Sequence, residues 1–168
     1  ARPAPGALEV VTASMRTHPA TFKVQVWGVS LLERWAESFV ADVAAAGGIE
    51  LALQALRTHP AAEQIQGYGC RLLGAFANAS MSSLASIRAS GGVELVQTAL
   101  RVHRSATFVQ ACGCLALQRF LHTDAGHRGA TEPDLEHALK ELQGAHAGLP
   151  TCTLLQGLAR SGGCSISS

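Results

Sequence analysis

Three recurring histidines are the first candidates for chemistry, because imidazole is the commonest side-chain ligand of transition metals in proteins. His18, His59 and His103 follow one another at intervals of roughly 40 residues, a spacing typical of helical repeats. Equivalent residues in stacked repeats lie on the order of 10 Å apart, whereas a metal holds each imidazole nitrogen at about 2 Å. We therefore predict no metal site, and expect these rings to cap carbonyls at helix ends. The remaining histidines lack ligand-type spacing, and for them a surface role is as good an interpretation as a structural one: His122, His127, His137 and His146.

The cysteines are an odd number spread through apolar helical pattern: Cys70, Cys112, Cys114, Cys152 and Cys164. This distribution favours reduced, buried thiols in a cytosolic protein over disulfides. Cys112 and Cys114 are two residues apart, so on a helix their side chains point about 200° apart and do not share one ligand.

No motif for catalysis is present. The sequence lacks a Gly-x-Ser-x-Gly elbow, a phosphate-binding Gly-rich loop ending in Lys-Ser/Thr, and paired carboxylates in an apolar setting. We therefore expect neither an enzyme nor a cofactor; the remaining enzymatic hypothesis needs a catalytic domain outside this chain. A net charge of +1 lacks the basic excess that phosphate binding requires, which argues against nucleic acid. No apolar run reaches the roughly 18 residues of a membrane span and no signal peptide is visible, so we expect a cytoplasmic protein without a membrane partner.

The sequence repeats itself, and the repeat predicts the fold. Gly6-Ala7-Leu8-Glu9 returns as Gly47-Gly48-Ile49-Glu50 and again as Gly91-Gly92-Val93-Glu94. Further residues keep the same offsets: Arg16, Arg57 and Arg101; the three histidines; Gln25, Gln66 and Gln110; Gly28, Gly69 and Gly113; Trp35, Phe76 and Phe120. Because 48% of the residues are hydrophobic but only 5% are aromatic, the core must consist largely of Leu, Ala, Val and Ile, which favours an all-helical protein.

Start and stop signals divide the second repeat into three helices. After the Gly-Gly break, Ile49, Leu53 and Leu56 recur at helical spacing, and Pro60 ends that helix and suits the first turn of the next, predicted over 61–77. That helix carries one apolar stripe, Ile65, Gly69, Leu72, Leu73 and Phe76. A short helix over 82–89 follows, with Leu84 and Ile87 facing inward.

Several segments together resemble a known family. Residues 47–56, Ile65-Gln66, Leu72-Leu73 and residues 87–91 are similar to the armadillo consensus of three helices per repeat, and the resemblance covers residues 6–122. His59-Pro60, Ile65-Gln66 and Gly69-Cys70 further resemble the armadillo regions of leucine-rich-repeat kinases and kinase-like proteins.

The resemblance implies an all-α, right-handed armadillo-type solenoid. One domain over 6–160 would contain repeats at 6–46, 47–90 and 91–122 and a degenerate capping repeat at 123–160, with helices at 131–142 and 150–160. Residues 1–5 would be a linker and residues 161–168 a flexible tail. Glycine inside a helix costs about 1 kcal/mol relative to alanine, so Gly69 and Gly113 are expected where two helices of a repeat approach most closely.

The resemblance also implies a protein–protein interaction module, scaffolding or regulatory within a larger signalling protein. Peptide-binding armadillo proteins place an asparagine near the end of each last helix; the equivalent positions here hold Arg34, Ala75 and Arg119. This departure argues against a nuclear-import function and favours a folded partner or a neighbouring domain.

The candidate partner-binding residues are Arg34 and Arg119, with Glu33 and Gln118 beside them. Guanidinium groups suit carboxylates, so we expect a partner that presents an acidic segment. Two alternatives remain: both arginines are ordinary solvated charges, or the chain forms a weak homodimer through its end repeats.

Overall fold

The computed structural model describes residue 4 and residues 6–122, and every regular element within these ranges is an α-helix. The described residues all belong to the first of two compact units, Ala1–Arg128. The predicted capping repeat at 123–160, the tail at 161–168 and nearly all of the linker at 1–5 lie outside the described residues, as do His127, His137, His146, Cys152 and Cys164. The all-α class is confirmed for the part of the chain that is described.

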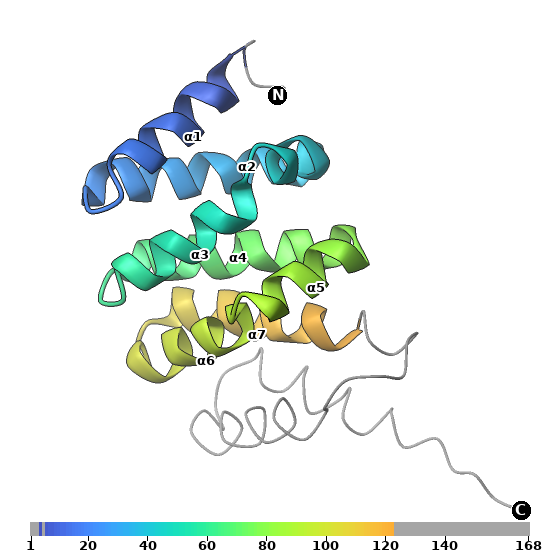
Figure 1. The fold of residues 1–168 in the computed structure, drawn as a ribbon. Coiled ribbons are helices and arrows are strands. Elements are labelled where there is room, and N and C mark those ends of the chain that lie inside the picture. The colour runs from blue at the N-terminus through green and yellow to red at the C-terminus, as the bar shows by residue number, and fades with distance from the viewer. Residues whose placement is uncertain (1–3, 5, 123–168) are drawn as a thin grey trace, which may run out of the picture. The chain divides into compact units, whose positions relative to one another are not determined.

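The helices form three similar groups along the chain, shown in Figure 1. The first repeat, 6–46, contains α1 (Ala7–Thr17) and α2 (Phe22–Ala45); the second, 47–90, contains α3 (Gly48–Thr58), α4 (Glu63–Ala79) and α5 (Met81–Ala89); the third, 91–122, contains α6 (Gly92–Val102) and α7 (Thr107–His122). The long helices α2, α4 and α7 pack side by side, with α4 between the other two. This layer of long helices carries most of the contacts between repeats.

A short helix precedes each Gly-Gly pair. Before Gly47 it is the end of α2, set off by a kink at Phe39, whose backbone is non-helical at φ −135° and ψ 42°. Before Gly91 it is α5, which begins one residue before the predicted range because the Ser80 hydroxyl caps it, accepting from the backbone N–H of Ser83 at 3.1 Å. Gly47 and Gly91 then turn the chain with φ of 86° and 73°, conformations that glycine adopts without strain.

The start of α4 differs from the prediction. The predicted start at residue 61 is wrong, because α4 begins at Glu63. Pro60 and Ala61 instead form a turn that the backbone N–H of Ala62 closes on the carbonyl of His59 at 3.1 Å.

The core lies where the predicted stripes meet. Every member of the α4 stripe is buried, and so are Leu84 and Ile87 of α5, which confirms the predicted inward faces. The close approach at Gly69 and Gly113 is confirmed too: a Cβ at either position would lie 2.7 Å from a methyl carbon of Leu56 or Leu100. Each glycine therefore lets two helices of its repeat pack together.

Among the described helices, none alone is long and apolar enough to cross a membrane; α2 and α3 meet that criterion only as a pair, bent by 101°.

Candidate partner-binding face

A buried glutamine joins two helices at the same place in each repeat. The amide nitrogen of each one donates to two backbone carbonyls near the end of the preceding helix: Gln25 to Met15 and His18, Gln66 to Leu56 and His59, Gln110 to Leu100 and His103. The carbonyl of each histidine also accepts from a backbone N–H, that of Thr21, Ala62 or Ala106. The glutamine adds a second hydrogen bond there and joins the start of each long helix to the end of the helix before it.

The recurring histidines connect neighbouring repeats. The ring Nε2–H of His59 donates to the carbonyl oxygen of Pro19 at 2.8 Å, and that of His103 to the carbonyl of Pro60 at 2.7 Å. We expected the rings to cap helix carbonyls; instead the backbone N–H groups do so, as in His59 to Ala55. The rings thus bind loops one repeat away. Within the described ranges, no group of three His, Cys, Asp or Glu side chains is arranged to hold a metal ion.

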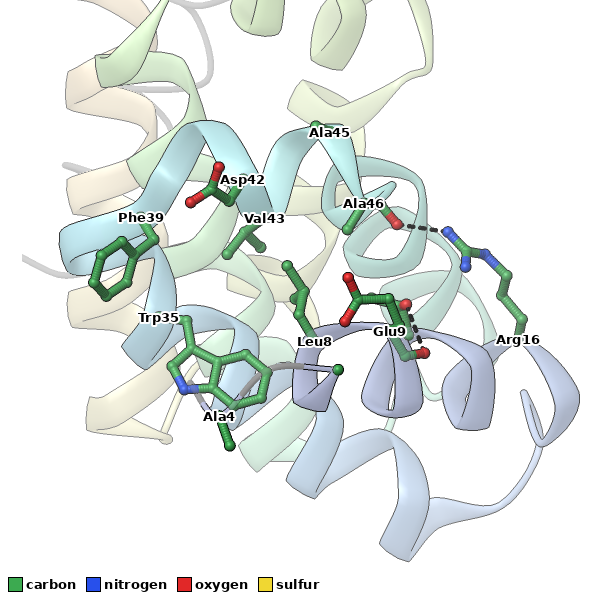
Figure 2. A pocket seen from close by; sticks show the side chains of 12 residues that line it. Ala4, Leu8, Glu9, Arg16, Trp35, Phe39, Asp42, Val43, Ala45 and Ala46 are labelled. Carbon is green, nitrogen blue, oxygen red and sulfur yellow. Dashed lines mark hydrogen bonds between the residues drawn. The ribbon is translucent and has the colours of Figure 1, made fainter. Parts of the chain in front are cut away.

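Arginines reach in the opposite direction along the chain. The Arg16 guanidinium donates to the carbonyl of Ala46 at 2.6 Å, as Figure 2 shows, and Arg57 donates to the carbonyl of Ser90. Both acceptors follow the last turn of a short helix, where the helix dipole favours a positive charge. Each of these arginines thus ties the first helix of its repeat to the end of the short helix that closes the repeat.

The long helices present one common face, which we call the long-helix face. Its residues recur at helical spacing on each helix, at equivalent positions of the repeats. They are Lys23, Trp27, Ser30, Arg34 and Glu37 on α2; Gln64, Tyr68, Arg71, Ala75 and Asn78 on α4; and Phe108, Leu115 and Arg119 on α7.

One end of this face is aromatic. Trp27 is 68% exposed and Phe108 is 39% exposed, large fractions for such side chains. The Phe108 ring covers Gly67 and meets Tyr68 edge to face, with ring centroids 5.1 Å apart. A cavity of about 410 Å³ opens between Trp27 and Tyr68, with Phe22 at its margin. The exposed rings of Trp27 and Phe108 and the half-buried ring of Tyr68 together offer an apolar surface with one member from each repeat.

The other end of the face is charged. The Arg71 guanidinium forms an ion pair with Glu33 at 2.6 Å and lies 3.8 Å from Glu37. Burial raises the pKa of the Glu33 carboxyl above its ordinary value, and Arg71 offsets this only in part. Arg34 is exposed and forms no ion pair with the described residues.

The predicted site residues differ in how deeply they are buried and in what they contact. Arg34 is exposed on the face, whereas Arg119 and Gln118 are half-buried on α7, and the Arg119 side chain packs beside Gly74. Glu33 is only 6% exposed and is held by Arg71.

Sequence reasoning missed the aromatic residues and Arg71. Trp27 and Tyr68 do occupy equivalent positions, and both lie off the apolar stripe of their helix, which was an available signal. Phe108 occupies the position of Gln64, and Arg71 that of Ser30 and Leu115, so neither stands out from the repeat pattern.

The described cysteines lie inside the helix packing. Cys70, Cys112 and Cys114 are free and buried. Burial raises the pKa of the Cys112 thiol to about 11 and also raises that of Cys70, so both are uncharged at neutral pH. Such thiols are poor nucleophiles and metal ligands.

No protein-family model, curated protein or solved structure matches this chain.

Proposed function

We propose that this chain is an armadillo-type right-handed solenoid that serves as a protein–protein interaction module, scaffolding or regulatory within a larger signalling protein. The observation that carries the proposal is the long-helix face, where the exposed Trp27 and Phe108 and the half-buried Tyr68, one from each repeat, line up beside a charged end. Large exposed aromatic residues mark binding surfaces more often than single exposed leucines or valines do.

The partner chemistry follows from the two ends of the face. Trp27, Tyr68 and Phe108 fit aromatic or aliphatic side chains, which would bury apolar area against them. At the other end Arg71 already holds Glu33 and Glu37, so the exposed Arg34 charge is available to a carboxylate from outside. The matching partner is therefore an acidic segment that also carries large apolar residues.

A pair of labelled peptides tests this assignment. One peptide alternates Glu with Phe and Leu, and the control has Lys in place of each Glu. Fluorescence anisotropy should show saturable binding of the acidic peptide, weakened by salt, and binding of the Lys peptide weaker by about tenfold or more. Equal affinity for both peptides, or no binding of the acidic one, would overturn the assignment.

A protein variant places the binding on this face. Trp27→Ala removes the most exposed ring and should weaken the binding of the acidic peptide. Val102→Ala, on the exposed side of α6, should leave the affinity for this peptide unchanged. The reverse pattern would move the binding surface away from the long helices.

A further inference from the structure

The cavity of about 410 Å³ on the long-helix face lies between the first turns of α2 and α4. We call it the α2–α4 cavity, and the side chains around it are Phe22, Lys23, Val26, Trp27 and Ser30 of α2 with Gln64 and Tyr68 of α4. Its volume is near the lower end of the range for small-ligand sites, about 300–1,000 Å³. The cavity therefore has room for one large side chain rather than for a helix.

The next pair of long helices, α4 and α7, shows what occupies the equivalent place. Phe108 at the start of α7 lies over α4, where a Cβ on Gly67 would overlap its ring. The same ring meets Tyr68 edge to face, with centroids 5.1 Å apart. One repeat earlier, the residues at the positions of Phe108, Gly67 and Tyr68 are Gln64, Val26 and Trp27. An aromatic ring of the chain itself thus occupies the α4–α7 counterpart of the cavity.

The α2–α4 cavity stays open among the described residues because it lacks such a ring. Gln64 takes the position of Phe108 and is exposed. Trp27 is 68% exposed, whereas Tyr68, against the Phe108 ring, is half-buried. The equivalent of the pair of Tyr68 and Phe108 is therefore half complete: Trp27 is in place, and its aromatic neighbour is absent from the described part of the chain.

A small residue on α2 adds to the open space. Ser30 lines the cavity, whereas the residues at its position in the later repeats, Arg71 and Leu115, have longer side chains. Leu115 is 40% exposed, so a leucine at this position of a long helix needs no place in the core. Ser30→Leu therefore adds volume at the wall of the cavity and leaves the core as it is.

One positive charge stands at the cavity. Lys23 is the only charged side chain among the residues described around it, and it is exposed. Within the described ranges Lys23 forms no ion pair. An ammonium group beside apolar and aromatic walls suits an aromatic ring that has a carboxylate next to it.

We propose that the α2–α4 cavity seats one aromatic side chain of the partner protein, and that an acidic residue next to it in the partner's sequence pairs with Lys23. The ring would pack against Trp27 as Phe108 packs against Tyr68. This proposal rests on the proposed function, because it names the partner residue that enters the long-helix face and the place where it binds.

Two acidic peptides without Trp or Tyr test the aromatic part. One has a single Phe next to a Glu, and the other has Ala in place of that Phe. In a Trp35→Phe background Trp27 is the only tryptophan, so its emission reports on the cavity. The Phe peptide should shift this emission to shorter wavelength in a saturable way, and the Ala peptide should bind about tenfold more weakly or less.

Filling the cavity tests the location. Ser30→Leu should lower the affinity for the Phe peptide to that for the Ala peptide, and should leave the Ala peptide unaffected. Ser30→Ala, which keeps the cavity open, is the matched control and should bind both peptides as the wild type does. Circular dichroism should show the wild-type helical spectrum for both variants. Wild-type affinity of folded Ser30→Leu for the Phe peptide would overturn the proposal.

A neutral side chain in place of Lys23 tests the charge. Lys23→Gln should weaken the Phe peptide about threefold, as expected for an ion pair exposed to water, and should not affect a peptide that has Gln in place of the Glu next to Phe. Equal losses for both peptides would overturn the pairing. Equal affinity of the wild type for the Phe and Ala peptides would overturn the aromatic seat alone, whereas binding of neither peptide would overturn the proposed function with it.

Discussion

The imidazole Nε2 of His103 lies 2.7 Å from the carbonyl oxygen of Pro60, a residue of the preceding repeat. His103 is buried whereas Pro60 is exposed, and this hydrogen bond joins their two repeats. His59 makes the same contact with Pro19, whereas His18, in the first repeat, is exposed.

His103→Phe keeps a ring but removes the donor. Because Pro60 is exposed, its carbonyl can turn to water, and we expect the free energy of unfolding to fall by about 0.5–1.5 kcal/mol, the net contribution of one hydrogen bond, in urea titrations. His18→Phe, at the equivalent exposed position, should change it by less than about 0.5 kcal/mol. Equal effects at both positions would mean that the bond between repeats contributes nothing.

Gln66→Leu tests the junction inside a repeat. The substitution keeps much of the side-chain volume but removes the amide donor from the Leu56 carbonyl, while the His59 carbonyl keeps the Ala62 N–H, at a cost of about 1–3 kcal/mol. Gln64→Leu, two residues earlier and exposed, provides the matched control, with a change within about 0.5 kcal/mol. Thermal melting of the two variants separates the outcomes; similar melting temperatures would show that water replaces the amide.

Gly69→Val places a side chain against Leu56. The added Cβ would start 2.7 Å from a Leu56 methyl carbon, so the core must shift, which destabilises the protein by about 1–3 kcal/mol. Gly69→Ala should cost less than Gly69→Val, since fewer atoms must be accommodated. An unchanged melting temperature for the valine variant would show that the two helices have room between them.

Glu33 gives the stability a definite pH dependence. Because its pKa is raised in the folded protein, the folded state binds more protons, and stability is lost as pH rises through the window that begins near the ordinary value of 4.5. Glu33→Gln removes this titration. The melting temperature of this variant minus that of the wild type should therefore increase from pH 4 to pH 7. Glu37→Gln, whose side chain is 65% exposed, should show little such change. A relative melting temperature that decreases over that range would mean that Arg71 outweighs the cost of burial.

The helices and their inward faces could be predicted because they are encoded locally. Gly47 and Gly91 mark the repeat boundaries, and the α4 stripe reads directly from residue spacing. The contact of His59 with Pro19 could not be predicted, since it depends on the register between repeats rather than on neighbours in sequence.

The candidate site was predictable only in part. The repeat alignment located Arg34 and Arg119, but it carries no information on which neighbouring helix meets them. The buried Glu33 is held by Arg71 of the next repeat. In the other two repeats, the residues equivalent to Arg71 are Ser30 and Leu115. The aromatic end of the face depends likewise on side chains that differ between repeats.

Charge reversal on the long-helix face tests the central claim most directly, measured as the affinity for the acidic aromatic peptide by fluorescence anisotropy. Arg34→Glu combined with Arg119→Glu should weaken binding by roughly 100-fold or more, because two charge-assisted contacts become repulsive. Arg101→Glu combined with Arg104→Glu, both exposed at the end of α6 and in the loop before α7, is the control that changes the same charge elsewhere. Circular dichroism must show the helical spectrum of the wild type in both variants. If the folded double variant binds the peptide with wild-type affinity, the long-helix face is not the partner-binding surface.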